Sequence, residues 1–263
     1  MADPVELVTH EWQPAATDAV PPVAVLVHGV TGWHRTWWRV GPGLAERGWR
    51  VIAVDQRGHG TSPRIEGAAT IDDLAADLEA AIERRATPPI DLLIGHSLGA
   101  VVSMRLALRR PGIARRLVLE DPPSIDRAAD EEFFASIRDG VRAAGETPAA
   151  EAARELAENP RWLDEDARQN VEGRALADAE GIVASMRRPR PFAVIDAAAD
   201  LEIPTLFLLA DDERSVLLGP ARDRLRHALP AASRIREFES GHTIHRDQFD
   251  EFLAAVLEWA PKR

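Results

Sequence analysis

Short apolar runs alternate along the chain with longer stretches that have the period of a helix, and this alternation restricts the possible folds. Several runs lack a polar residue at every second position, which is typical of strands buried on both faces. The pattern predicts an α/β fold, a mostly parallel sheet wrapped by helices. The runs span Val23 to Gly29, Trp49 to Asp55, Ile90 to Gly95, Arg116 to Asp121, Pro204 to Ala210 and Ser233 to Glu239.

Two further segments complete the predicted architecture. Val5 to Trp12 is expected to add an antiparallel strand at the edge of the sheet. Residues 122–199 show no strand pattern and contain amphipathic pieces rich in Ala, Glu and Arg. Because strand-like runs resume after them, we expect a helical cap inserted into a core made of residues 1–121 and 200–263.

Composition excludes several classes of function. The formal net charge of −11 disfavours binding to nucleic-acid phosphates or anionic lipid. The absence of cysteine excludes disulfides and thiolate catalysis. No stretch resembles a secretory leader, and no apolar run approaches the roughly 18 residues that would span a membrane. The sequence therefore predicts a cytoplasmic protein that acts on a small molecule.

The stretch GHSLG at residues 95–99 places Ser97 between a predicted strand and a predicted helix. In such a G-x-S-x-G turn the serine has a strained backbone, and the glycines avoid clashes with neighbouring chain segments. The turn lifts the hydroxyl clear of the sheet at a helix N-terminus. Ser97 is therefore predicted to be a nucleophile.

A serine hydroxyl needs a base within hydrogen-bond reach and a third group that orients the base. His242 follows Gly241 in a loop between the last predicted strand and the last helix, which is a suitable place for that base. Among the eight histidines its competitor is His245, which stands near the helix start and is interpreted as a helix-entry or capping residue.

Five stretches together resemble the α/β-hydrolase fold superfamily: VLVHGVTGW, VIAVDQRGHGTS, GHSLGA, PTLFLLADDE and SGHTIHRDQF. They occur in the family's order over essentially the whole chain. The resemblance implies a sheet of the eight-stranded type, Ser97 as nucleophile and His242 as base. It also implies an oxyanion hole formed by the backbone N–H groups of Val30 and Leu98, and a helical cap.

The carboxylate that orients the base is left open between two arrangements known in the family. The commoner position follows the run PTLFLLA, where Asp211, Asp212 and Glu213 are candidates. The other position is the end of the preceding strand, where Glu120 stands, and we slightly prefer Glu120 over Asp211. Asp121 is interpreted as a turn residue.

The residues predict a serine hydrolase that cleaves a small or medium carboxylic ester or lactone without a cofactor. Trp33 and Trp162 are candidates for the wall of the substrate pocket, with packing in the core as the alternative. No spacing typical of metal ligands is present, so no metal is expected. Amide or carbon–carbon bond hydrolysis, acyl transfer, and a non-catalytic ligand receptor on the same fold remain alternatives.

Overall fold

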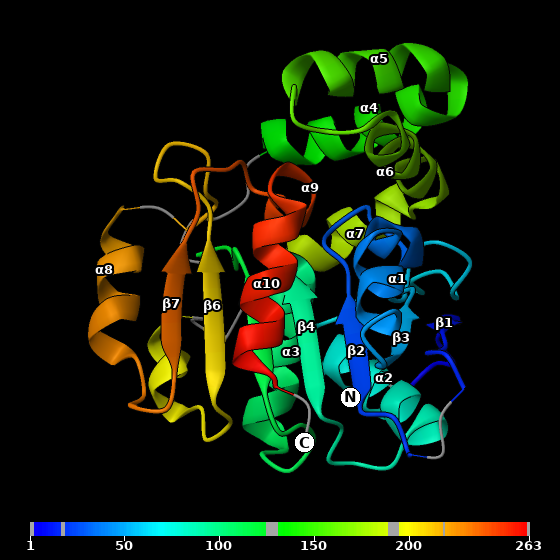
Figure 1. Ribbon diagram of the computed structural model, residues 1–263. Helices are drawn as coiled ribbons and strands as arrows, with labels where there is room; N and C mark the ends of the chain where they lie inside the picture. Colours follow the sequence, from blue (N-terminus) through cyan, green and yellow to red (C-terminus); the bar gives the residue numbers. More distant parts are fainter. Residues whose placement is uncertain (1–2, 17–18, 125–130, 189–194, 218, 262–263) are drawn as a thin grey trace.

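A computed structural model describes residues 3–16, 19–124, 131–188, 195–217 and 219–261, in which seven strands form one sheet (Figure 1). Their order is β1-β3-β2-β4-β5-β6-β7, and every neighbouring pair is parallel except β1 with β3. This confirms the predicted α/β class and the antiparallel edge strand, although the resemblance implied eight strands. The strands are β1 Thr9–Trp12, β2 Val23–Val27, β3 Arg50–Val54, β4 Leu92–His96, β5 Leu117–Glu120, β6 Thr205–Leu209 and β7 Arg234–Glu237.

Helices cover both faces of the sheet (Figure 1). One face packs against side chains of α2, α3 and α8, and the other against side chains of α1 and α10. Alternate residues of the inner strands β2 to β6 contribute to the two apolar clusters, which is why these strand sequences are mostly apolar, whereas the edge strands are more polar. These helices are α1 Val40–Ala45, α2 Ile71–Arg85, α3 Leu98–Arg109, α8 Gly219–Ala228 and α10 Phe249–Trp259.

Helix α2 shows how local sequence sets an element boundary. The Thr70 hydroxyl accepts a hydrogen bond from the Asp73 N–H, and the Asp73 carboxylate accepts one from the Thr70 N–H. This capping box satisfies two backbone donors that the first turn leaves without partners. Leu74, Leu78 and Ile82 lie one turn apart and are buried against the sheet.

Four helices lie over the carboxyl ends of the strands (Figure 1), and we call them the cap: α4 Glu131–Glu146, α5 Pro148–Glu158, α6 Asp164–Leu176 and α7 Ala179–Met186. Phe134 and Ile182 belong to its own small apolar cluster, against which Val30 of the core packs. The exact borders of the insertion stay predictions, because residues 125–130 and 189–194 lie outside the described residues.

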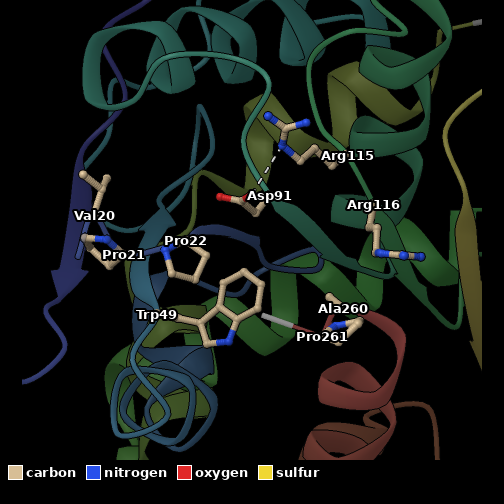
Figure 2. A pocket seen from close by; sticks show the side chains of 9 residues that line it. All are labelled: Val20, Pro21, Pro22, Trp49, Asp91, Arg115, Arg116, Ala260 and Pro261. Atoms are coloured by element: carbon tan, nitrogen blue, oxygen red, sulfur yellow. Dashed lines mark ion pairs between the residues drawn. The ribbon is translucent and has the colours of Figure 1, made fainter. Parts of the chain in front are cut away.

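A cavity of about 370 Å³ opens at the amino ends of the parallel strands (Figure 2). It is lined by residues that precede β2 to β5, among them Pro22, Trp49 and Asp91. Arg115 closes one side and forms an ion pair with Asp91, with Nε and Oδ1 3.4 Å apart. The cavity therefore lies at the edge of the sheet opposite the cap.

We predict that Asp77→Ala lowers the free energy of unfolding by about 3–5 kcal/mol, because it leaves a buried guanidinium without its carboxylate. Asp77 on α2 accepts two hydrogen bonds from Arg57 and one from the Val5 N–H, and both charged side chains are buried. Urea denaturation measures the loss. Glu83→Ala is the control, since its ion pair with Arg110 is exposed and should contribute less than about 1 kcal/mol. Equal losses in the two variants would contradict the prediction.

Candidate active site

Ser97 lies in the tight turn between β4 and α3, with φ 51° and ψ −118°. A Cβ at Gly95 would lie 2.3 Å from the Gly99 carbonyl oxygen, and one at Gly99 would lie 2.2 Å from that of Val27. Only glycine fits at such close approach of backbone to backbone. The turn thereby fixes Ser97 at the carboxyl end of β4 and directly before the first residue of α3.

Three non-glycine residues in the described part of the chain have a positive φ, namely Thr31, Ser97 and Asp121. They follow β2, β4 and β5, which are neighbours in the sheet. Left-handed backbone at residues with a side chain costs free energy and is concentrated at functional sites. Strain at three adjacent strand ends therefore marks this edge of the sheet as the candidate active site.

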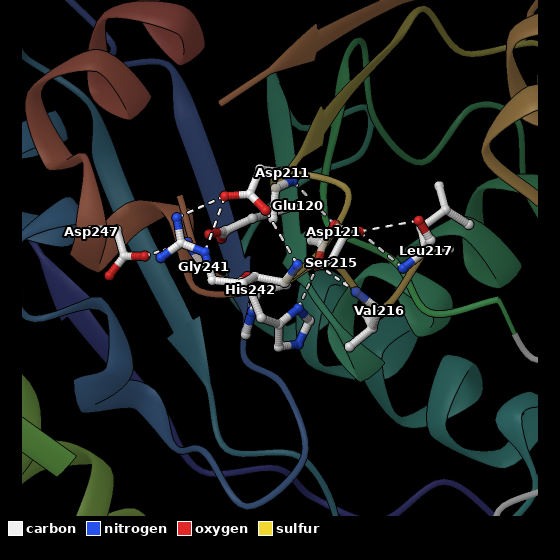
Figure 3. Close-up of polar contacts among 12 residues, drawn as sticks. Glu120, Asp121, Asp211, Ser215, Val216, Leu217, Gly241, His242 and Asp247 are labelled. Carbon is white, nitrogen blue, oxygen red and sulfur yellow. Dashed lines mark hydrogen bonds and ion pairs between the residues drawn. The ribbon is translucent and has the colours of Figure 1, made fainter. Parts of the chain in front are cut away.

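The Asp121 carboxylate is fully buried and accepts hydrogen bonds from three chain segments (Figure 3). The Ala210 N–H and the Ser215 hydroxyl donate to Oδ1 at 3.2 and 2.6 Å, and the Val216 N–H donates to Oδ2 at 3.1 Å. The fourth donor is His242, whose Nδ1 lies 2.6 Å from Oδ2. These bonds compensate the desolvation of the charge and fix its position.

His242 is oriented by this bond. Because a carboxylate only accepts, Nδ1 carries the hydrogen and Nε2 is left with a free lone pair. The His242 side chain is 30% exposed, so its ring is partly accessible. Its ring lies 4.6 Å from the ring of His96, the residue that precedes Ser97. Burial holds the pKa of His96 well below its usual value, so His96 stays neutral.

The loop after β2 brings backbone donors to the same place. Gly29 packs so closely on the turn that a Cβ there would lie 3.0 Å from the Ser97 Cβ. The Gly32 N–H bonds to the Gly29 carbonyl, whereas within the described residues the N–H of Val30 has no acceptor. The same holds for the N–H of Leu98, which opens α3. Two unused donors beside a serine could bind an oxyanion.

The structure corrects the predicted carboxylate, because neither Glu120 nor Asp211 contacts His242. Glu120 faces the same side of the sheet as Val118, two residues earlier, and its carboxylate bonds to His245. Asp211 is half-buried and bonds to the Arg214 guanidinium. The other two candidates also lie elsewhere: Asp212 pairs with Arg222, and Glu213 is exposed.

Asp121 is the functional candidate that sequence reasoning assigned to a turn. It lies one residue beyond the end of β5, where the positive φ turns its side chain away from the face that buries Glu120. The alternation of side chains along the strand could have indicated this, since it places position 120 on the same face as Val118, among the apolar side chains that pack against α1 and α10. The carboxylate predicted from the sequence lies at the end of this strand, at Glu120, whereas in the structure the next residue, Asp121, bonds to His242.

Three tryptophans link the cap to the core through their indole N–H groups. Trp33 donates to the Gln169 carbonyl at 3.0 Å, Trp38 to Asp166 Oδ1 at 2.8 Å, and Trp162 to Asp247 Oδ1 at 2.9 Å. Trp33 is buried and follows the loop that carries Val30. Trp162 stacks on the Arg246 guanidinium at 4.5 Å. Both predicted pocket residues therefore act in cap docking, and their role as pocket walls stays a prediction.

The described residues contain no group of three or more His, Asp or Glu side chains arranged to hold a metal ion. None of the described helices is long and apolar enough to cross a membrane.

Comparisons with known proteins agree with this geometry. Residues 22–248 match the family model described as alpha/beta hydrolase fold. The chain is 30% identical over 248 residues to the Variovorax paradoxus (strain S110) protein named "Putative carbamate hydrolase RutD", covering 89% of this chain and 92% of that protein. It is 26% identical over 255 residues to the sn-1-specific diacylglycerol lipase ABHD11 of Mus musculus, covering 92% and 82%. An esterase from Exiguobacterium antarcticum superposes with a TM-score of 0.75 at 16% identity, covering 97% and 96%.

We predict that Ser97→Gly has a free energy of unfolding about 1–2 kcal/mol above that of Ser97→Ala. Glycine relieves backbone strain of about 1–3 kcal/mol at this φ, and gives back part of it through its more flexible unfolded state. Urea denaturation of both variants measures the difference. At exposed Ser136 in α4 the order should reverse, with alanine about 1 kcal/mol better than glycine. The same order at both serines would contradict strain at Ser97.

Proposed function

Because this chain belongs to the family with the alpha/beta hydrolase fold, we propose that it is a serine hydrolase that cleaves a carboxylic ester or lactone through an acyl-enzyme on Ser97. The substrate is a small or medium-sized molecule. His242 is the general base, and Asp121 is the carboxylate that orients it. Val30 and Leu98 supply the oxyanion hole.

In the first half of the reaction the Ser97 hydroxyl attacks the carbonyl carbon while its proton moves to Nε2 of His242. Asp121 accepts the hydrogen bond from Nδ1, so it stabilises the imidazolium that forms. The carbonyl oxygen becomes an oxyanion and accepts hydrogen bonds from the two backbone N–H groups. Collapse of the tetrahedral intermediate expels the alkoxide, which takes the proton from His242 and leaves as the alcohol.

In the second half a water molecule attacks the acyl-enzyme. His242 accepts a proton from this water, and the same two N–H groups stabilise the second oxyanion. The Ser97 oxygen is then the leaving group and regains a proton from His242. The product is the carboxylic acid, and a lactone opens to a hydroxy acid by the same steps.

One observation carries this proposal: the buried Asp121 carboxylate lies 2.6 Å from His242 at the strand end next to that of Ser97. A strained serine alone could belong to a structural turn. An imidazole oriented by a carboxylate at the neighbouring strand end is what serine nucleophiles require for activation. Hydrolase relatives that align over most of the chain add independent support.

Amide or carbamate hydrolysis is the second candidate, favoured by the relative that bears a carbamate hydrolase name. An amide of the same acid forms the same acyl-enzyme as the ester, whereas a carbamate that loses its amine leaves a carbonate ester on Ser97. The difference lies in the leaving nitrogen, which must be protonated by the His242 imidazolium before it can depart. Rates on a 4-nitrophenyl ester and the corresponding anilide of one acyl group separate the two candidates.

The proposed function is tested with a fluorophosphonate probe and a short-chain 4-nitrophenyl ester. We expect the wild-type protein to be labelled and to turn over the ester many times, and Ser97→Ala to lose both properties. Ser103→Ala is the matched control, since Ser103 lies on the same helix and is buried away from the site. Labelling that survives in Ser97→Ala would overturn the assignment, and release of at most one product per protein would instead indicate a ligand receptor.

We predict that Asp121→Asn lowers kcat by about 10³–10⁴-fold, because an amide cannot stabilise the imidazolium and favours the wrong tautomer of His242. Asp211→Asn should stay within about threefold of the wild type, because this half-buried carboxylate bonds to Arg214 and not to the imidazole. Steady-state kinetics on the same ester measure both variants. A large loss in Asp211→Asn with little change in Asp121→Asn would reverse the assignment of the acid.

A further inference from the structure

A second carboxylate–imidazole pair lies directly below the candidate active site. Both side chains are buried, Glu120 completely and His245 to all but 2%. The Glu120 carboxylate accepts the His245 backbone N–H at 2.9 Å, and His245 Nδ1 lies 2.8 Å from Oε2. The reaction described above does not use this pair, so its presence needs a separate explanation.

Glu120 bonds both to the turn that carries Ser97 and to the segment that carries His245. Glu120 lies opposite His96 in the pairing of β5 with β4, and its backbone carbonyl oxygen accepts a hydrogen bond from the Ser97 N–H at 3.0 Å. Its carboxylate holds His245, which belongs to the short helix α9 (Ile244–Asp247) just after His242. One residue therefore connects the strand that precedes the nucleophile with the helix that follows the base.

His245 has no other polar anchor in the described part of the chain. Its Nε2 is buried without a hydrogen-bond partner, and its ring packs against Trp37 at 4.5 Å and Phe252 at 5.9 Å. Apolar packing holds the ring in its layer but does not fix its rotation. The Glu120 carboxylate therefore sets the orientation of the His245 ring and the start of α9.

The position of His245 is coupled to that of His242 in two ways. The first is the backbone of α9, whose Arg246 and Asp247 N–H groups both bond to the Thr243 carbonyl. The second is the ring of His96, which lies 5.3 Å from the His245 ring and 4.6 Å from the His242 ring. His96 Nε2 also lies 3.2 Å from the His242 carbonyl oxygen. A shift of His245 would therefore move the α9 backbone and the His96 ring, both of which adjoin the His242 imidazole.

We propose that Glu120 and His245 are positioning residues that hold His242 in reach of Ser97. This inference rests on the proposed function and adds to it. An apolar residue at position 120 would continue the layer that contains Val118 and would avoid burying a carboxylate. The polar pair in its place specifies one arrangement of α9, as buried polar groups do where a unique geometry is needed.

The pair also makes the arrangement depend on pH. The titratable or charged side chains around the Glu120 carboxylate are Asp121, His96, His242, His245 and Arg246. Burial raises the pKa of Glu120 to about 7, whereas burial holds the pKa of His96 and of His245 well below the usual value. Glu120 therefore changes charge near neutral pH while the two buried imidazoles stay neutral.

The sign of the effect follows from the hydrogen bonds. Above pH 7 the ionised carboxylate accepts both N–H groups of His245. Below pH 7 the carboxyl group is neutral, so Oε1, which lies 2.9 Å from the backbone nitrogen and 3.0 Å from Nδ1 of His245, accepts both bonds without the charge that strengthens them. Protonation of Glu120 therefore weakens the hold on His245 and lowers kcat on the acid side.

The test compares pH profiles of the wild type, Glu120→Gln and the control Glu258→Gln, whose side chain is exposed on α10. Because Glu120→Gln lacks this charge at every pH, the ratio of wild-type to Glu120→Gln kcat should fall as the pH is lowered through 7. At pH 8.5 its kcat should be about 10–100-fold below that of the wild type with KM changed less than about threefold, the pattern expected when a catalytic group is slightly misplaced. Glu258→Gln should match the wild type throughout.

Two variants of His245 separate positioning from simple packing. Asparagine places its side-chain N–H₂ close to the position of His Nδ1 and can still donate to Glu120, whereas leucine fills the space without a donor. We expect His245→Asn to retain most of kcat and His245→Leu to lose about as much as Glu120→Gln. Equal kcat in the two variants would overturn the proposal, even if both are less stable than the wild type.

The pH dependence of the ratio between wild-type and Glu120→Gln kcat gives a further test. A ratio that stays constant from pH 8.5 to below pH 7 would overturn the proposal, because it would leave no role for the ionisation of Glu120. If the wild type neither labels with the fluorophosphonate nor turns over ester, the proposed function itself fails. If it does both and Glu120→Gln has the same profile and kcat, only the positioning pair is refuted.

Discussion

The buried carboxylate of Asp121 holds together segments that are far apart in the sequence. It binds the end of β6 at Ala210, the following loop at Ser215 and Val216, and the loop of His242. None of these loops has a regular structure that would fix it alone. The position of the His242 imidazole is therefore set by a carboxylate at the end of β5, and the four protein donors around this carboxylate compensate its burial.

The sheet makes this arrangement possible by placing strained residues at neighbouring strand ends. Strain at one isolated residue can be relieved by a small movement of the chain. At Ser97 the movement is blocked, because Gly95 and Gly99 leave no space between the turn, α3 and the end of β2. The free energy of close packing below the site thus offsets the cost of a geometry that an isolated turn would not adopt.

The sequence was sufficient for those features that depend on local pattern and chain order. The strands, the turn at Ser97 and the loop of His242 each have a signature within a few residues. The carboxylate that bonds to His242 has a weaker one, because Glu120 and Asp121 are adjacent and only the direction of each side chain, which alternates along the strand, separates their partners. That direction depends on the backbone angle at Asp121. The contacts of Trp162 depended in the same way on how the cap packs on the core.

The three indole bonds between cap and core have a consequence for how such a chain can diverge. Two of them start from the segment after β2, at Trp33 and Trp38, and end on α6, while Trp162 reaches down to Asp247. A recombinant in which residues 131–186 come from a homologue would have to supply acceptors for the first two indoles and a donor for Asp247. Where the homologue lacks these hydrogen-bonding groups, its helices would dock in another orientation, and the loops of Val30 and His242 would shift with them.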